Sequence, residues 1–442
     1  MAMVVKNNLS AKNTLNELNK NEKARTKNLK NLSTGMKINS AEDDASGYAI
    51  SEKMQTQIRS LSQDLDNTQT AMSMLKVAEG GVQSTVDILS TLKEKVINAA
   101  NDTNTDADRA IIQKELDQAV NQIDENANVM YNGKIVLDGS HNNEVNPATY
   151  TVLANESLDP NIGIFDNITD MTDSTGRSLG ILADSKIEYS FVYQGQTYTS
   201  VLDPVGTNVV QDMFAQSIMP DGTYMANSSI ITADLSNIIG KDRTNTDVET
   251  VDGNPALLFK ALQSGVDGQI AGLTINVVNK DGSTNLTANA VLNDFREAIR
   301  AENESPDNAL VFQIGAKANQ TVKMGFSDMR STALGLRAND GTSLSITTQE
   351  KANAAINVLD LAIGKALTVQ TNIGSVENRM EFTAANITTA NENTQATESI
   401  IRDADMAREM TAYTKNNVLV QASQSMLAQA NQNSSAVLSL LQ

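Results

Sequence analysis

Apolar side chains recur at alternating spacings of three and four residues along both ends of the 442-residue chain. This spacing places them on one face of an α-helix and is typical of helices that pack along a seam. In the N-terminal part it predicts a helix ending near residue 38, a second over about 43–100 and a third over 107–129. The first stripe contains Leu15, Leu18, Leu29, Leu32 and Met36, with Glu22 and Arg25 at its centre, and the second contains Ile58, Leu61, Leu65, Met72 and Leu75.

The C-terminal part of the chain has the same rhythm. Neither end can bury its apolar stripe alone, so we expect the N- and C-terminal helices to pack on each other, antiparallel, with the middle inserted at the tip. One C-terminal stripe begins with Ile356, Leu359 and Ile363, and a second contains Met406, Met410, Val420, Leu427, Val437 and Leu441.

The segment Asn39–Ala45 interrupts the pattern between the first two helices. We expect Ser40 to cap the second helix, whose first turn would then hold Glu42, Asp43 and Asp44 near the positive end of the helix dipole. Inside this long helix, Gly80–Gly81 is a weak point, because a glycine costs about 1 kcal/mol relative to alanine.

The middle of the chain has a different pattern, with short strand-like runs separated by turn residues. Residues 187–193 and 197–202 predict a hairpin, and residues 273–278 predict a strand before a turn at 279–282. Short helices are expected at 209–218, 255–263 and 287–301, which makes the middle a self-contained α+β domain. Strand-like runs at 134–137 and 310–314 border it, and 316–328 is expected to form a hairpin beside the first of these.

Charge separates the middle from the ends. The net charge is −19, and residues 141–308 alone contain 23 acidic and 8 basic residues. All six prolines also lie in this middle segment. An acidic, proline-bearing centre between two nearly neutral, proline-free ends indicates a solvated insert between helical arms. The first 37 residues carry eight basic and two acidic residues, so this arm is expected to need acidic or polar partners.

Composition excludes several chemistries. The chain has no Cys, and its one His, His141, is expected to be a polar loop residue. Without a thiolate or a second His we expect no catalytic triad, no metal centre and no cofactor. The acidic balance argues against nucleic-acid binding. No apolar run approaches the roughly 18 residues of a membrane span, and the N-terminus has no signal-peptide pattern, so no membrane segment is expected.

Three passages resemble bacterial flagellin, the subunit of the flagellar filament. Leu32–Ile50 is similar to the family's N-terminal signature, and Tyr131–Leu137 to the border of its outer segment. Ile401–Ala407, Ser425–Asn431 and Val437–Gln442 are similar to its C-terminal signature. The match covers about 1–140 and 309–442. Residues 141–308 resemble no family, as expected for a segment that varies among flagellins.

The resemblance implies a fold that is mainly α at the ends, a long antiparallel helical bundle or coiled coil, with an inserted α+β outer domain. Residues 1–42 and 396–442 would line an inner tube, 43–140 and 309–395 a surrounding tube with a small β-hairpin, and 141–308 would be exposed on the surface. The terminal helices would be poorly ordered in the monomer and fold when neighbouring copies cover them.

The same resemblance implies a structural protein that self-assembles into the extracellular filament for swimming motility. Its partners would be identical subunits, a flagellar export chaperone that holds 402–442, the filament cap and the hook-junction proteins, after secretion by the type III flagellar apparatus. The alternative is a hook–filament junction protein, which shares the terminal helices. A metalloprotease flagellin would need two His one helical turn apart, and this chain has one. An adhesin or immune ligand would be a second role of 141–308.

One stretch resembles the segment of flagellins that a vertebrate Toll-like receptor recognises. It runs from Leu89 to Asn101, and Glu115 matches an acidic partner in the next helix. Strongly recognised members have Arg at the position of Thr91 and Leu at that of Lys95. Losing a guanidinium removes forked hydrogen bonds, and a lysine adds a charge to a buried contact. We therefore expect weak receptor activation.

Overall fold

The computed structural model describes residues 8–213, 216–218, 224–226 and 230–440, and side chains outside 214–229 and 433–440. The chain forms two compact units. Unit 1 comprises Met1–Thr68, Gln313–Gln320 and Phe382–Gln442, and unit 2 comprises Gln69–Phe312 and Thr321–Glu381. Each combines segments far apart in sequence, as expected if N- and C-terminal helices pack together.

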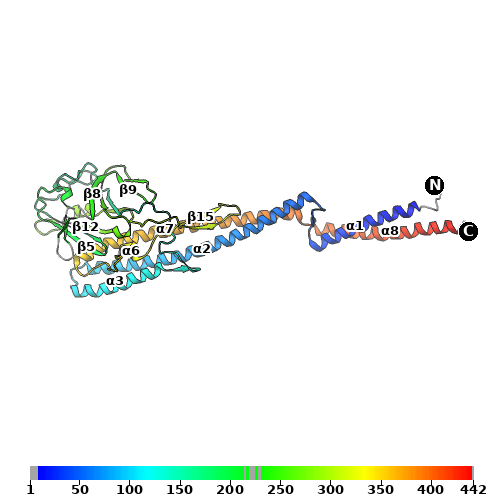
Figure 1. The fold of residues 1–442 in the computed structure, drawn as a ribbon, viewed down its shortest axis with the longest axis horizontal. Coiled ribbons are helices and arrows are strands. Elements are labelled where there is room, and N and C mark those ends of the chain that lie inside the picture. The colour runs from blue at the N-terminus through cyan, green and yellow to red at the C-terminus, as the bar shows by residue number, and fades with distance from the viewer. Residues whose placement is uncertain (1–7, 214–215, 219–223, 227–229, 441–442) are drawn as a thin grey trace. The chain divides into compact units, whose positions relative to one another are not determined.

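Unit 1 contains α1 (Leu9–Thr34), α8 (Met406–Leu440), the first part of α2 (Ala45–Ala99) and the last part of α7 (Gln349–Arg402). In Figure 1, α1 (blue) and α8 (red) lie side by side, with both chain ends at the same end of the pair. The two helices are therefore antiparallel, as the stripes predicted. The predicted break between the first two helices is also confirmed, since α1 ends at Thr34 and α2 begins at Ala45.

Unit 2 holds the rest of α2 and α7 together with α3 (Asp106–Ala127) and α6 (Ser331–Leu334). Thr105 and Asp108 form a reciprocal capping box at the start of α3. Helix α2 runs through Gly80–Gly81 without a break. A side chain at Gly81 would clash, because an ideal Cβ there would lie 2.9 Å from Cδ1 of Leu137. This glycine therefore allows the segment after α3 to pack closely on α2.

Helix α7 changes one expectation about membrane segments. By length and composition alone it could cross a membrane, since it contains an 18-residue window with a mean hydropathy of 1.2. Half of that window is buried within the fold, as is usual for a core helix. The expectation that no stretch is apolar enough to span was therefore wrong for α7, although burial already accounts for its hydrophobicity.

The inserted region is built on two antiparallel sheets, in which the order of the strands differs from their order in the chain. A five-stranded sheet has the order β12-β4-β5-β6-β7, and a four-stranded sheet the order β13-β3-β11-β8. The first contains β4 (Lys186–Tyr193), β5 (Gln196–Leu202), β6 (Gln216–Ile218), β7 (Tyr224–Ala226) and β12 (Ile270–Val278); the second contains β3 (Val152–Asn155), β8 (Ile231–Ser236), β11 (Ala256–Ala261) and β13 (Arg296–Ile299).

The predicted hairpin and strand are confirmed by β4, β5 and β12. Their inward side chains form the main core of the insert with side chains of the second sheet. Phe191 stacks on Tyr198 with ring centroids 5.4 Å apart and meets Phe259 edge-on at 5.8 Å. These rings join β4 and β5 to β11, so the two sheets share one core.

Three predicted helices in the insert need correction. Residues 255–263 form the strand β11, 287–301 divide into α5 (Leu286–Leu292) and β13, and 209–218 divide into α4 (Val210–Met213) and β6. Strand β11 lies between β3 and β8 and is buried along almost its whole length. A strand buried on both faces has no alternation of polar and apolar residues, so its pattern cannot be distinguished from that of a buried helix.

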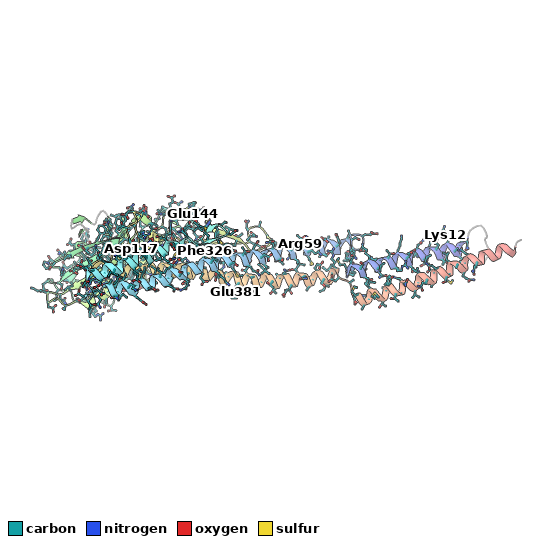
Figure 2. The ribbon with its side chains drawn as sticks, turned by 90° about the horizontal axis from the view of Figure 1, so that it is seen from below. Lys12, Arg59, Asp117, Glu144, Phe326 and Glu381 are labelled. Atoms are coloured by element: carbon teal, nitrogen blue, oxygen red, sulfur yellow. The ribbon has the colours of Figure 1, made fainter. Side chains whose placement is uncertain are left out.

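Three further strand pairs are small. They are β1 (Met130–Tyr131) with β2 (Lys134–Ile135), β9 (Ile238–Lys241) with β10 (Asp247–Glu249), and β14 (Leu310–Gln313) with β15 (Thr321–Met324). We expected the piece 316–328 to lie beside the first border strand. It pairs instead with the second border strand, β14. It reaches the first border segment just beyond, where Met329 N donates to Leu137 O at 2.9 Å. Phe326, labelled in Figure 2, is fully buried beside this point.

The insert is not self-contained, because it is seated on α7 within unit 2. Lys365 of α7 pairs with Glu297 of β13 at 3.1 Å, and its side chain is only 4% exposed. Asn357 donates to Leu273 O at 2.9 Å. At Gly272, with φ of +63°, an ideal Cβ would lie 2.4 Å from Val358, so only glycine permits this approach.

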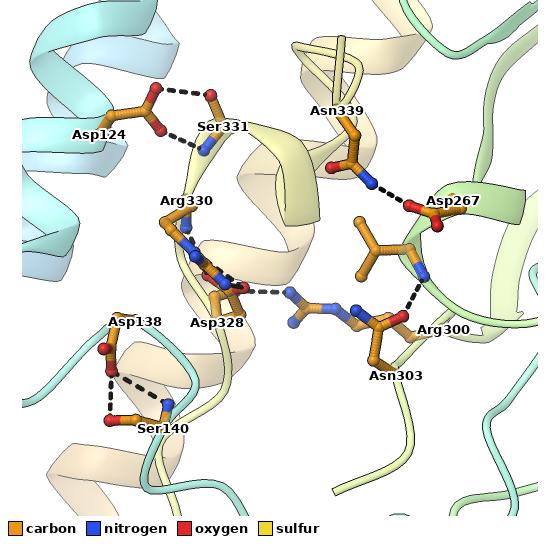
Figure 3. A network of polar contacts seen from close by, with 11 residues as sticks. Asp124, Asp138, Ser140, Asp267, Arg300, Asn303, Asp328, Arg330, Ser331 and Asn339 are labelled. Carbon is orange, nitrogen blue, oxygen red and sulfur yellow. Dashed lines mark hydrogen bonds and ion pairs between the residues drawn. The ribbon is translucent and has the colours of Figure 1, made fainter. Parts of the chain in front are cut away.

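A polar network completes the seating (Figure 3). Arg300 of the insert donates to Asp328 O at 2.8 Å, and Asp267 and Asn339 are hydrogen-bonded. On the other side, Asp124 of α3 accepts from both the backbone N and the hydroxyl of Ser331 at 2.8 Å. The segment 328–339 therefore links the insert to α3.

Candidate assembly surface

The two breaks in the helical arms lie against each other in unit 1. Gly35 ends α1 in the left-handed conformation, with φ of 72°. Its carbonyl accepts from Ala404 N at 2.9 Å, and Arg402 O accepts from Lys37 N at 2.7 Å. These bonds join the turn after α1 to the turn between α7 and α8. We call residues 35–44 and 402–405 the joint.

Arg402 is the central side chain of the joint. It is only 8% exposed, and its guanidinium lies 2.9 Å from Glu52 and 4.0 Å from Glu398. It also lies over the ring of Tyr48, 5.5 Å from the centroid. One buried cation thus connects the C-terminal end of α7 to the first two turns of α2. Arg402 was not among the residues selected by the sequence pattern, although it lies inside the C-terminal passage.

The start of α2 differs from the expected cap. Residues 40–43 form a turn before the helix, and α2 begins only at Ala45. The N-terminal cap is Asp44, whose Oδ1 accepts from Ser46 N at 3.1 Å and Gly47 N at 3.0 Å. The expectation that Ser40 caps a helix with three acids in its first turn was wrong. The reason is that the Asp44 carboxylate accepts the free backbone N–H groups of Ser46 and Gly47, so the helix starts after Asp44 and residues 40–43 stay outside it.

Asp43 serves the joint in another way. Lys27 of α1 lies 3.0 Å from its Oδ1, and Asn39 N donates to its Oδ2 at 3.2 Å. The hydrogen bond from the Lys27 side chain lowers the pKa of Asp43, and the Asn39 backbone contributes in the same direction. The side chain of Asn39 in turn donates to Asn31 at 3.0 Å. Polar side chains of the turn therefore hold it to α1.

Side-chain hydrogen bonds run along the seam between α1 and α8. Asn21 donates to the hydroxyl of Ser423 at 3.1 Å, and Asn28 donates to Glu409 at 2.6 Å. Asn416 donates to the side-chain oxygen of Asn28 at 2.7 Å, so one amide bridges two residues of α8. At the far end, the Asn8 side chain donates to Ala430 O at 3.2 Å. The sequence pattern had selected Ala430 as a stripe residue, but none of the polar residues in these contacts.

The predicted stripe of α1 is therefore divided between two environments. Leu18, Leu32 and Met36 are half-buried, whereas Leu15 and Leu29 are 44% and 53% exposed. The predicted stripe of α8 is likewise divided between buried and exposed positions. Val420 is buried and Leu427 half-buried, but Met406 and Met410 are 48% and 52% exposed. Val437 lies in α8 beyond the described side chains, and Leu441 lies outside the described residues.

The stripes of α2 and α7 are better covered. Leu75 and Leu359 are fully buried. The remaining members are half-buried: Ile58, Leu61, Leu65, Met72, Ile356 and Ile363. The helices run antiparallel in both units, with Gln55 meeting Glu398 in unit 1 and Lys93 meeting Asp360 in unit 2.

The receptor-like stretch lies on α2 in unit 2, and its residues have different environments. Leu89 is fully buried in the core, whereas Thr91 is exposed and its hydroxyl donates to Asp87 O at 2.9 Å. Lys95 and Glu115 are brought together as an ion pair, with Nζ 3.0 Å from Oε1. Lys95 of α2 thus already pairs with the acidic residue of α3.

Comparison with known proteins agrees with this arrangement. The family model for the bacterial flagellin N-terminal helical region matches residues 5–142, and the model for the bacterial flagellin C-terminal helical region matches residues 356–441. Together they include both sides of the joint, and the region between them contains the sheets of the insert.

Several curated relatives match over nearly the whole chain. A flagellin from Clostridium tyrobutyricum is 32% identical, over 97% of this chain and 99% of its own length. Flagellin FlaB2 from Treponema pallidum and the flagellin of Bacillus subtilis are each 28% identical, over 99% of this chain and 100% of their own. The solved flagellar hook associated protein-3 from Legionella pneumophila matches 78% of this chain and 97% of its own at 17% identity, with a TM-score of 0.34. With matching models at both ends and a relative above 30% identity along its full length, the chain belongs to the bacterial flagellin family, the structural subunits of the extracellular flagellar filament.

Proposed function

We propose that copies of this chain assemble into the filament through the apolar side chains that α1 and α8 leave exposed. The observation that carries the proposal is the division of the two stripes. Leu15, Leu29, Met406 and Met410 are about half exposed, while polar side chains occupy the seam between the helices. A chain that exposes such residues on two long helices needs a covering surface.

Helix α8 supports the proposal further. From Asn416 to its end at Leu440 it contains no charged residue. Val418 and Met426 are 58% and 62% exposed, so apolar side chains also lie off the seam. A helix that is apolar on several faces is stable in water only when other elements cover it. Identical copies are the natural partners, because the family forms filaments of identical subunits.

The place of each segment in the polymer is part of the proposal. Residues 1–42 and 396–442 form an inner tube, 43–140 and 309–395 a surrounding tube, and 141–308 the outer surface. The acidic charge of the insert supports the last assignment, since repulsion between like-charged outer surfaces favours solubility and opposes lateral bundling. Secretion through the type III flagellar apparatus, an export chaperone on 402–442, and contacts with cap and hook-junction proteins complete the proposed life of the subunit.

The decisive experiment compares charged substitutions on the exposed stripe with matched substitutions beside it. Leu29→Glu and Met410→Glu place a carboxylate on the proposed contact faces, and Asn13→Glu and Gln424→Glu add the same charge at exposed positions outside the stripes. All four subunits should keep their helical content. Electron microscopy of salt-induced polymer should show filaments for the controls and none for the stripe variants. Filaments of normal length from both stripe variants would refute the proposal.

Weak activation of the Toll-like receptor is a separate proposal. Its support is the Lys95–Glu115 ion pair, which occupies the acidic residue that the family uses as a partner, and the missing guanidinium at Thr91. In a cell reporter assay the unsubstituted chain should be a poor agonist, and Thr91→Arg with Lys95→Leu should raise its potency. Strong activation at low dose by the unsubstituted chain would contradict it.

A further inference from the structure

Strand β12 lies at an edge of the five-stranded sheet, where β4 is the one described strand that pairs with it. The open edge of a strand is a template for pairing with another chain, and proteins often protect it with charged side chains. The edges of the other sheet follow this rule, since β8 carries Asp234 and β13 carries Arg296 and Glu297. Strand β12 contains no charged residue and no proline, so its edge needs another form of protection.

Asparagine side chains occupy the centre of this edge. Asn293 makes two hydrogen bonds with Ile275, accepting from its backbone N at 2.7 Å and donating to its O at 2.6 Å. Asn289 accepts from the backbone N of Val277 at 2.7 Å. The two amides thus bond the outward backbone groups of alternate residues, as the residues of an adjacent antiparallel strand would.

Both ends of the edge are occupied as well. At one end, the side chain of Asn357 in α7 donates to Leu273 O at 2.9 Å. At the other end, Val277 O accepts from the backbone N of Asn285, the residue that caps the start of α5. The outward edge of β12 is therefore bonded at residues 273, 275 and 277. We call Asn289, Asn293 and Asn357 the edge asparagines.

Helix α5 (Leu286–Leu292) holds two of the edge asparagines in place. Its residues Ala288 and Leu292, four apart, are fully buried in the core of the insert. Asn289 and Asn293 follow them directly in the sequence, have the same spacing and are half-buried. A helix of seven residues is not stable alone in water, so its place on β12 depends on these contacts.

We propose that the edge asparagines close a self-association site, and that an opened β12 edge would pair with β12 of a second copy of the chain. Two identical antiparallel strands form a self-complementary pair. An uncharged strand rich in β-branched residues has the composition of segments that pair in this way. Closure of the edge is a property of the single subunit. Its consequence for filaments rests on the proposed assembly function, because inserts on a filament surface lie close to one another.

The test changes the edge in two ways. Asn289→Ala with Asn293→Ala, the alanine variant, removes the amides from the edge. Asn289→Asp with Asn293→Asp, the aspartate variant, loses the amide donors but places carboxylates there, which should repel a second copy. Asn237→Ala with Asn254→Ala is the matched control, since both asparagines are exposed in the insert and the change in composition equals that of the alanine variant.

The first measurement is sedimentation velocity in low-salt buffer without filament seeds. At about 100 µM we expect dimers of the alanine variant and monomers of the control and of the aspartate variant. A monomeric alanine variant would overturn the proposal. Association of the aspartate variant to the same extent would also overturn it, because loosening of the insert and not the open edge would then be the cause.

Hydrogen exchange of the peptide that contains Ile275 and Val277 locates the contact. In the alanine variant at about 1 µM its amides should exchange about tenfold faster than in the control, and at about 100 µM the partner strand should restore their protection. Exchange equal to that of the control at the lower concentration would show that the amides do not close the edge. If circular dichroism shows that the alanine variant has unfolded, Asn293→Ala alone decides by the same comparisons.

Electron microscopy of salt-induced polymer tests the consequence for filaments. Filaments of the alanine variant should associate laterally, whereas those of the control and of the aspartate variant should stay separate. Separate filaments of the alanine variant would overturn this consequence. If the control also forms no filament, the proposed assembly function fails, while sedimentation of the subunits still decides whether the edge asparagines close the β12 edge.

Discussion

The two pairs of long helices in this chain are built differently. Between α2 and α7 in unit 2, fully buried apolar residues continue along both helices, including Leu75, Leu89, Leu359 and Ile373. Among the side chains of α1 and α8 that the structure describes, up to residue 432, only those of Asn31, Val420 and Ala430 are buried. The first pair completes its own core, and the second fills its seam with amides and leaves leucines and methionines outside. The contrast teaches that helical pattern alone does not tell a finished interface from one that awaits a partner.

Truncating one leucine in each helix pair tests the difference between the pairs most directly. Leu89→Ala removes a fully buried side chain and should lower the free energy of unfolding by about 2–5 kcal/mol. Leu29→Ala removes a side chain that is 53% exposed in the subunit and should cost only about 0.5 kcal/mol. Urea unfolding of the two full-length variants checks both values.

When variants of equal subunit stability are compared, filament yield should fall for the truncation of Leu29, although that truncation hardly lowers the stability of the subunit. Leu29→Ala should reduce polymer at temperatures where its subunit is as stable as the unsubstituted one. A subunit destabilised by Leu29→Ala as strongly as by Leu89→Ala would mean that α1 is already covered in the monomer, and the distinction between the pairs would be lost.

The contact between the insert and α7 tests whether α7 forms a fully packed interface within unit 2. Lys365 is almost fully buried, and burial lowers its pKa while Glu297 acts in the opposite direction. Glu297→Gln leaves that ammonium without its partner and should cost about 3 kcal/mol. Lys365→Met combined with Glu297→Leu should recover most of the loss, because neither buried charge remains.

Urea unfolding of Lys365→Met, Glu297→Leu and the double variant that combines them gives the coupling between these residues. Additive losses would show that the pair does not interact. Equal stability of Glu297→Gln and the unsubstituted chain would show that Lys365 is solvated and that the insert is not seated on α7 through this contact.

The lengths and breaks of the helices could be predicted because they depend on local sequence. The long helices, the break near residue 40 and the antiparallel return all follow from the 3-4 periodicity and its interruption, and the structure confirms them, although not the cap expected at Ser40. The hairpin of β4 and β5 was equally local, with Gln194–Gly195 between two alternating strands. Strand β11 was not, because burial on both faces removes the alternation that identifies a strand.

The candidate surface was only partly predictable. The stripes identified the right helices, but the pattern could not decide between Leu15 and Thr14, or between Leu29 and Asn28, as seam positions. That choice depends on partners in α8, almost 400 residues later. Arg402 illustrates the same limit, since its partner Glu52 is 350 residues away. A recurrence of seven between Asn21 and Asn28, matched by Glu409, Asn416 and Ser423, was the one available signal.

Substitution of Arg402 tests whether the joint is held rigidly, although the α1–α8 pair beside it has few buried side chains. Arg402→Ala leaves Glu52 and Glu398 without their shared cation and should cost about 2 kcal/mol, less than a fully buried pair because Glu52 is 39% exposed. Hydrogen exchange should accelerate at 35–44 and 402–405 while α3 stays unchanged. Arg402→Lys keeps the charge but loses the fork, so it should show an intermediate effect. Unchanged exchange at the joint would show that its backbone bonds suffice.

The smallest expected effect concerns acid. The hydrogen bond from Lys27 lowers the pKa of Asp43 in the folded chain, so this carboxylate adds stability above its unfolded pKa of about 3.9. That contribution should be lost as pH falls through the lower, folded value, because protonation removes the attraction to Lys27. Lys27 is 55% exposed, which limits the effect to less than about 1 kcal/mol.

Hydrogen exchange at residues 36–44 between pH 5 and 2.5, corrected for intrinsic rates, measures this loss of protection. Lys27→Met should lower protection at pH 5 and flatten its dependence on pH, while Lys23→Met on the exposed face of the same helix should leave both unchanged. If Lys27→Met and Lys23→Met behave alike, the ion pair with Asp43 contributes nothing. The joint would then depend on Arg402 and its backbone hydrogen bonds alone. The α1–α8 pair would then have fewer stabilising side-chain contacts than the α2–α7 pair even at the joint.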